Sequence, residues 1–72
     1  MQKWEYLAAY CNDGRNGLTV QHINGIELKN WERGPYISDW LNDRGREGWE
    51  MVAWSEQEGG RIRRLFMKRP LA

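Results

Sequence analysis

The stretch that decides the fold is residues 35–54, PYISDWLNDRGREGWEMVAW. One face of an amphipathic helix is predicted by apolar side chains at spacings of one, three and four residues, namely Tyr36, Ile37, Trp40 and Leu41. Pro35 suits the first helical position, where its missing N–H costs little. We expect Gly45 to end the helix in the left-handed conformation. A helix this short is not stable alone, so it must lie on a sheet.

The strand expected to follow this helix is residues 48–54, GWEMVAW. Strand alternation places Trp49 and Met51 on one face and Val52 and Trp54 on the other. Both faces of this strand are therefore apolar, although one helix covers only one face of a sheet.

Three strands are predicted before the helix, at residues 3–11, 18–23 and 26–29. In the first, one face carries Trp4, Tyr6, Ala8 and Tyr10, and the other carries Glu5, Leu7, Ala9 and Cys11. In the second, Leu18, Val20 and His22 are expected to share a face. Residues 12–17, NDGRNG, are rich in turn formers and predict a loop. Asn24-Gly25 predicts a tight hairpin, because both residues tolerate positive φ.

A last strand is predicted at residues 61–69, after a turn at Glu58-Gly59-Gly60 and before Pro70, which ends it. The order β-β-β-α-β-β indicates an α+β fold, in which a single helix packs on one face of a mainly antiparallel sheet. We expect residues 1–72 to form a single small domain.

Composition narrows the function classes. Eleven basic and ten acidic residues leave a net charge of +1, whereas a general nucleic-acid binder is usually more basic. The sequence has no apolar run of membrane-spanning length and no signal-peptide core, so we expect a cytoplasmic protein without a membrane partner. Cys11 is the single cysteine, which excludes an internal disulfide and a multi-cysteine zinc site. We expect no cofactor and no bound metal.

The five tryptophans and the two apolar faces favour an interface. We expect the sheet face without the helix to pair with another copy in a homodimer, or with another protein. The interface candidates are Trp4, Tyr6, Tyr10, Trp49 and Trp54, although some of them must belong to the core. The alternative is that these aromatic side chains simply lie on the surface.

Several segments together resemble a small bacterial domain-of-unknown-function family with the pattern W-E-Y, then L-N-x-x-G-x-E-G-W-E-L-V, then F-K-R-P-L. The matching segments are WEY at 4–6, the block from Leu41 to Val52, and FMKRPL at 66–71. VQHINGIEL at 20–28 is similar to a V-N-G-x-x-L hairpin of some members. Met51 replaces the usual leucine, and Met67 lengthens the last motif by one residue. The resemblance implies a small α+β fold and brings no activity or catalytic residue.

No catalytic constellation is visible in the sequence, and we expect a protein that is not an enzyme. His22 has no nucleophile or orienting carboxylate nearby in sequence, so a surface or hydrogen-bonded histidine is favoured over a catalytic base. Cys11 is expected to be a small buried thiol. The acidic residues are too scattered to predict a metal site. A pocket lined by Tyr36, Trp40 and Trp49 is the only feature that an enzyme or ligand-binding function would rest on.

The last predicted strand carries the one dense group of cations, Arg61, Arg63, Arg64, Lys68 and Arg69. The favoured interpretation is an edge strand protected by charge against aggregation. The alternative is weak binding of single-stranded nucleic acid, with these cations on phosphates and surface aromatic side chains stacking on bases.

Overall fold

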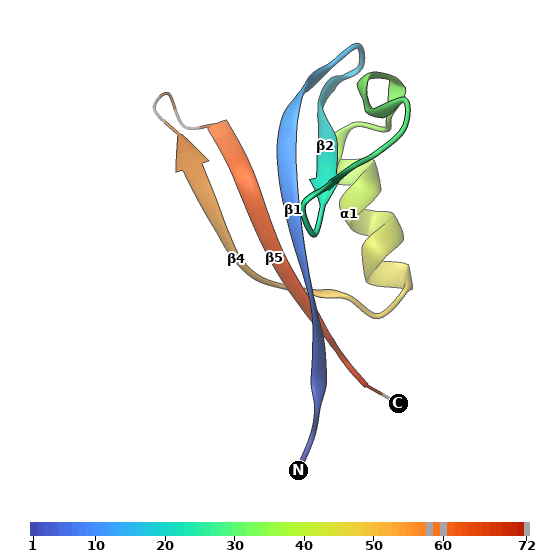
Figure 1. Cartoon of the computed structure of the whole chain (residues 1–72), viewed down its shortest axis with the longest axis vertical. Coiled ribbons are helices and arrows are strands. Elements are labelled where there is room, and N and C mark those ends of the chain that lie inside the picture. Colours follow the sequence, from blue (N-terminus) through green and yellow to red (C-terminus); the bar gives the residue numbers. More distant parts are fainter. Residues whose placement is uncertain (58, 60, 72) are drawn as a thin grey trace.

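A computed structural model describes residues 1–57, 59 and 61–71. Its elements are β1 (Trp4–Gly14), β2 (Gly17–Ile23), β3 (Ile26–Glu27), the 3-10 helix η1 (Trp31–Arg33), α1 (Ile37–Arg46), β4 (Glu50–Gln57) and β5 (Arg61–Pro70). The five strands form one antiparallel sheet in the order β3-β2-β1-β5-β4. Helix α1 lies beside β1 and β2, while the β4–β5 hairpin leans away from it (Figure 1). The predicted α+β class and element order are confirmed.

The core lies between α1 and the sheet. Alternate residues of β1 and β5 supply its floor, and the helix covers them with Ile37 and Trp40; the floor residues are Leu7, Ala9, Cys11, Leu65 and Met67, all buried. The predicted alternation in the first strand is therefore correct, and the helix covers the face of Leu7 rather than the face of Tyr6.

Both predicted ends of the helix were wrong. Tyr36 is the N-cap residue, so the helix begins at Ile37 and Pro35 lies outside it. Gly45 is an ordinary helical residue, and it is Gly48 that adopts positive φ, at 90°. The N–H of Trp49 donates to the carbonyl of Arg44 (3.1 Å), and that of Gly48 donates to Gly45 (3.0 Å). This pair of bonds is a Schellman motif, which needs its left-handed residue just beyond the helix.

The strand bounds also differ from those predicted. Strand β1 runs to Gly14 and β2 begins at Gly17, so most of the expected loop at 12–17 is strand. Trp49 precedes β4 instead of lying in it, and the third strand ends at Glu27. The Asn24-Gly25 turn is confirmed by φ values of 52° and 82°. The expected turn at 58–60 lies partly outside the described residues; Gly59 has φ 93°.

Three extra residues interrupt the strand pairing, and they change which side chains share a face. Gln21 of β2 has no partner in the β1–β2 ladder. In the β4–β5 ladder, Val52 of β4 and Arg63 of β5 have no partner. Each such bulge reverses the alternation beyond it. His22 therefore does not share a face with Val20, although this was expected. Trp54 likewise does not share a face with Val52.

The strand order corrects the interpretation of the last strand. Strand β5 pairs with β1 on one side and β4 on the other, so it is central and not a charged edge. Its central position is compatible with its cations because Arg61 pairs with Asp13 and Arg69 pairs with Glu5. The long edge strand is β4. No helix among the described residues is long and apolar enough to cross a membrane.

Candidate functional site

The sheet surface that points away from α1, called here the helix-free face, is built from rows of directly paired residues. The central row is Ala8, Phe66 and Ala53. The row towards the chain termini is Tyr6, Lys68 and Glu50, and the row on the other side is His22, Tyr10, Arg64 and Ser55. These residues share one face because they alternate with the buried residues Leu7, Ala9, Leu65 and Met67.

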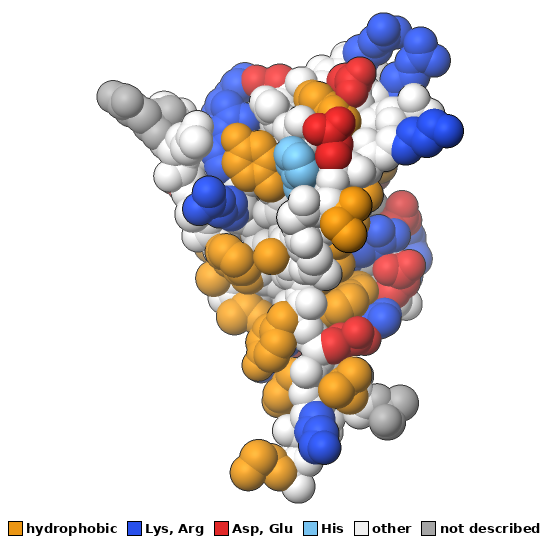
Figure 2. Space-filling model, in the orientation of Figure 1, with side chains coloured by type: hydrophobic (Ala, Val, Ile, Leu, Met, Phe, Trp, Pro, Cys, Tyr) orange, Lys and Arg blue, Asp and Glu red, His pale blue; other side chains and the backbone are white. Residues whose placement is uncertain are grey.

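Large apolar side chains on this face are open to solvent. Tyr6 is 67% exposed and Phe66 is 41% exposed, and Trp4 extends the same line towards the N-terminus. Figure 2 shows hydrophobic side chains following one another over β4, β5 and β1, with the histidine beside them. Large apolar side chains gathered on one face mark an interaction site more often than single exposed residues do.

A hollow lies in the middle of the helix-free face, above the small side chain of Ala8. Its walls are Tyr10, His22, Arg64 and Phe66, and its volume is about 380 Å³. The Tyr10 and His22 rings meet edge-on with centroids 5.7 Å apart, which fixes one wall. The opposite wall is the half-exposed Phe66. The hollow exists because alanine stands where the neighbouring rows carry tyrosine.

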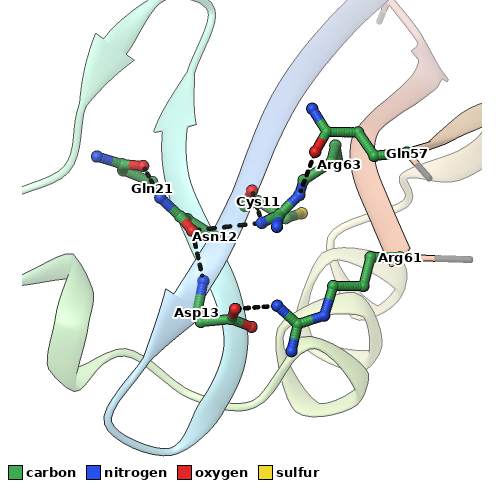
Figure 3. Close-up of polar contacts among 7 residues, drawn as sticks. All are labelled: Cys11, Asn12, Asp13, Gln21, Gln57, Arg61 and Arg63. Atoms are coloured by element: carbon green, nitrogen blue, oxygen red, sulfur yellow. Dashed lines mark hydrogen bonds and ion pairs between the residues drawn. The ribbon is translucent and has the colours of Figure 1, made fainter. Parts of the chain in front are cut away.

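A line of polar contacts, called here the polar belt, borders the face at the end away from the termini; its members are Gln57, Arg63, Asn12, Gln21 and Glu27, one from each strand. Arg63 donates to Gln57 Oε1 (3.1 Å), to Asn12 Oδ1 (3.3 Å) and to the Cys11 carbonyl (3.4 Å) (Figure 3). The bulge at Arg63 brings its guanidinium to this position. The rows of the helix-free face therefore end at a hydrogen-bonded border.

The structure brings together three of the five predicted interface residues, Trp4, Tyr6 and Tyr10. Trp49 instead packs against the core on the helix side, with the Arg69 guanidinium 4.3 Å from its ring centroid. Trp54 pairs with Leu65, which points to the helix side. Sequence reasoning missed Phe66 and Ala8 as central residues, although both follow from the alternation of strands that the sequence already showed.

The predicted nucleic-acid residues do not form one cluster. Arg64 and Lys68 lie on the helix-free face, and the Lys68 ammonium is 4.2 Å from the Trp4 ring centroid. Arg63 is held in the polar belt, and Arg61 and Arg69 are ion-paired with Asp13 and Glu5. Two of the five cations are thus displayed beside exposed aromatic rings, and three are engaged within the fold.

The remaining candidates from the sequence are the Cys11 thiol, the His22 imidazole and the expected pocket beside the helix, and none of them forms a catalytic arrangement within the described part of the chain. Cys11 is fully buried, and this burial raises the pKa of its thiol to about 11, with Arg63 opposing the shift. It is therefore a poor nucleophile. His22 Nε2 lies 3.7 Å from Glu27 Oε2 at the rim of the sheet. Tyr36 and Trp49 lie at opposite ends of α1, so the expected pocket between helix and sheet is not formed by those residues.

Among the described residues no group of His, Cys, Asp and Glu side chains is arranged to hold a metal ion. No protein-family model matches the chain, and neither a curated protein nor a solved structure matches it.

Proposed function

We propose that the protein is a non-enzymatic interaction module that forms a homodimer through the helix-free face. The observation that carries the proposal is the exposure of Tyr6 and Phe66 on the same face of two adjacent central strands, with Trp4 continuing the line of Tyr6 along β1. Aromatic side chains of this size are the usual energetic centres of protein interfaces. A different protein could bind the same surface instead of a second copy. The homodimer and such a complex exclude one another, because both cover the helix-free face.

The small core also favours association. Eight apolar side chains are buried among the described residues. A core of this size in a chain of about 70 residues supplies only a few kcal/mol, and such chains commonly gain stability from disulfides, metals or oligomerisation. The single cysteine excludes an internal disulfide. Covering the exposed aromatic side chains of the helix-free face would therefore add stability that the core alone does not provide.

The face is a better interface than the sheet edges. Strand β3, at one edge, has two residues. Strand β4, at the other edge, has a bulge at Val52, and bulges in edge strands discourage pairing with another chain. Glu50 and Glu56 also give β4 a negative charge, which opposes pairing with a second β4.

The test is the molar mass of Tyr6→Ser, measured by light scattering over a range of concentrations. Tyr6 makes no core contact, so the variant should fold and become monomeric where the wild type is dimeric. Ile26→Ser is the matched control, because Ile26 is 71% exposed on β3, away from this face. The proposal fails if the wild type is monomeric throughout, or if both variants remain dimers.

A second function is favoured by one observation, the position of Arg64 and Lys68 on either side of Phe66. Cations beside exposed aromatic rings suit single-stranded nucleic acid. Fluorescence anisotropy with a labelled single strand at low salt tests it: binding should weaken for Arg64→Ala and Lys68→Ala, and should weaken as salt increases. Absence of binding at low salt would exclude this function.

A further inference from the structure

We infer that the second copy packs face to face on the first with its strands aligned. The two copies are related by a two-fold axis that lies between the two sheets, parallel to β1 and β5 and above the boundary between these strands. In this arrangement Phe66 of each copy enters the hollow above Ala8 of the other. The inference rests on the homodimer proposed above and adds its orientation and register.

The central row gives the first argument. A two-fold axis along the boundary between β1 and β5 keeps each residue at its height along the strands and exchanges the two strands. It therefore places Phe66 of one copy opposite Ala8 of the other, twice by symmetry. A protruding ring then meets the hollow of about 380 Å³ that the small Ala8 side chain leaves open. The two surfaces are complementary in shape at the centre, where interface energy is usually concentrated.

The neighbouring rows give the second argument, which concerns charge. The same axis places Arg64 opposite Tyr10 and Lys68 opposite Tyr6 of the second copy. A cation over an aromatic ring is attracted by the ring's electron density. An axis across the strands, at right angles to the first, would place Arg64 opposite Lys68 and bring like charges together. The charges thus favour the axis along the strands.

The dimensions of the molecule allow this packing. Two aligned sheets pack about 10 Å apart with their strands within about 30° of one another. The molecule extends 41 Å and 25 Å along its two longer axes. A molecule of that extent is large enough for one side to bury the roughly 800 Å² per partner of a standard interface.

The first test fills the hollow from within. Ala8→Phe should raise the dimer dissociation constant by about tenfold or more, because the partner's ring no longer fits. Phe66→Ala should also weaken the dimer, because the ring that fills the hollow is lost. A mixture of the two variants should recover dimers by light scattering, since each Phe then faces an alanine. Ala8 is exposed, so the substitution does not disturb the core.

The second test fixes the orientation. Arg64→Glu should weaken the dimer about fivefold, because a carboxylate replaces the cation over Tyr10. Arg33→Glu is the control, since it makes the same charge change in η1, away from the face. A tighter or unchanged dimer for Arg64→Glu would overturn the inferred orientation, because a glutamate opposite Lys68 would attract it.

The homodimer and the packing of its two faces are contradicted by different results. A monomeric wild type contradicts the proposed function itself. A wild-type dimer that Ala8→Phe leaves intact contradicts only the packing of Phe66 above Ala8.

Discussion

Ala8 pairs directly with Phe66 across the β1–β5 ladder, so a small and a large side chain stand side by side at the centre of the helix-free face. The neighbouring pairs in the same ladder, Leu7 with Met67 and Ala9 with Leu65, are buried under α1. A shift of one residue would exchange the two sets of side chains between the faces. Burial of these residues on the helix side therefore fixes which side chains, large or small, lie on the helix-free face.

Leu65 should be among the costliest core residues to truncate. It is fully buried in the central strand β5, so Leu65→Ala should lower the free energy of unfolding by about 2–5 kcal/mol. Leu71→Ala removes the same atoms from an exposed position and should change it by less than about 0.5 kcal/mol. Urea unfolding followed by tryptophan fluorescence measures both. Equal losses would contradict the assignment of the core.

The two glycines near the end of α1 should respond in opposite directions to alanine. Gly48 has φ 90°, so Gly48→Ala should destabilise the protein by about 1–2 kcal/mol. Gly45 lies within the helix and has open space where a Cβ would stand, so Gly45→Ala should stabilise it by about 0.5–1 kcal/mol. Thermal and urea unfolding distinguish the signs. Destabilisation by Gly45→Ala would instead place the left-handed residue there.

Cys11 should make stability fall as the pH rises above about 9. The folded-state pKa of its thiol is about 11, against an ordinary value of 9.0, so the unfolded state releases this proton first. Between these two pH values folding loses up to about 3 kcal/mol, and below pH 9 the thiol has no effect. The difference between wild type and Cys11→Ala in urea unfolding from pH 7 to 11 isolates this loss. A difference independent of pH would contradict the raised pKa.

Arg63 should stabilise the junction between the two hairpins. Arg63→Leu removes its donations to Gln57 and Asn12 and to the Cys11 carbonyl, and should cost about 1–3 kcal/mol of unfolding free energy. Arg63→Lys keeps the charge but not the planar set of donors, so it should restore only part of the loss. Arg33→Leu, which removes a cation from η1, is the control and should be nearly neutral. Full rescue by lysine would mean that charge alone matters.

Local signals in the sequence correctly predicted the order of the strands and the α-helix, and the two faces of β1. The alternation around Leu7 separates the core residues from Tyr6, and Asn24-Gly25 forms the expected turn. These features depend on near neighbours in sequence and on general rules of alternation. They also contained the signal for Phe66, which alternates with Leu65 and Met67.

Features that depend on distant partners were not predictable in the same way. The bulge at Val52 reverses the direction of Trp54, and its position follows from pairing with β5. The charges of β5 predict an edge strand. Asp13 and Glu5, which lie on β1, form ion pairs with two arginines of β5 and make a central position possible. Gly45 was wrongly predicted as the helix stop, because Gly48 is a glycine at an equally plausible spacing and the local sequence does not distinguish them.

The most direct measurement is the relaxation of side-chain protons by a neutral gadolinium chelate, recorded by NMR at high and low protein concentration. Tyr36 and Trp54, which are 48% and 56% exposed off the helix-free face, serve as internal references. If the helix-free face is covered in the dimer, the ring protons of Tyr6 and Phe66 will be protected at high concentration and will relax faster on dilution, while the references will not change. Strong relaxation of Tyr6 and Phe66 at every concentration would contradict the covered face.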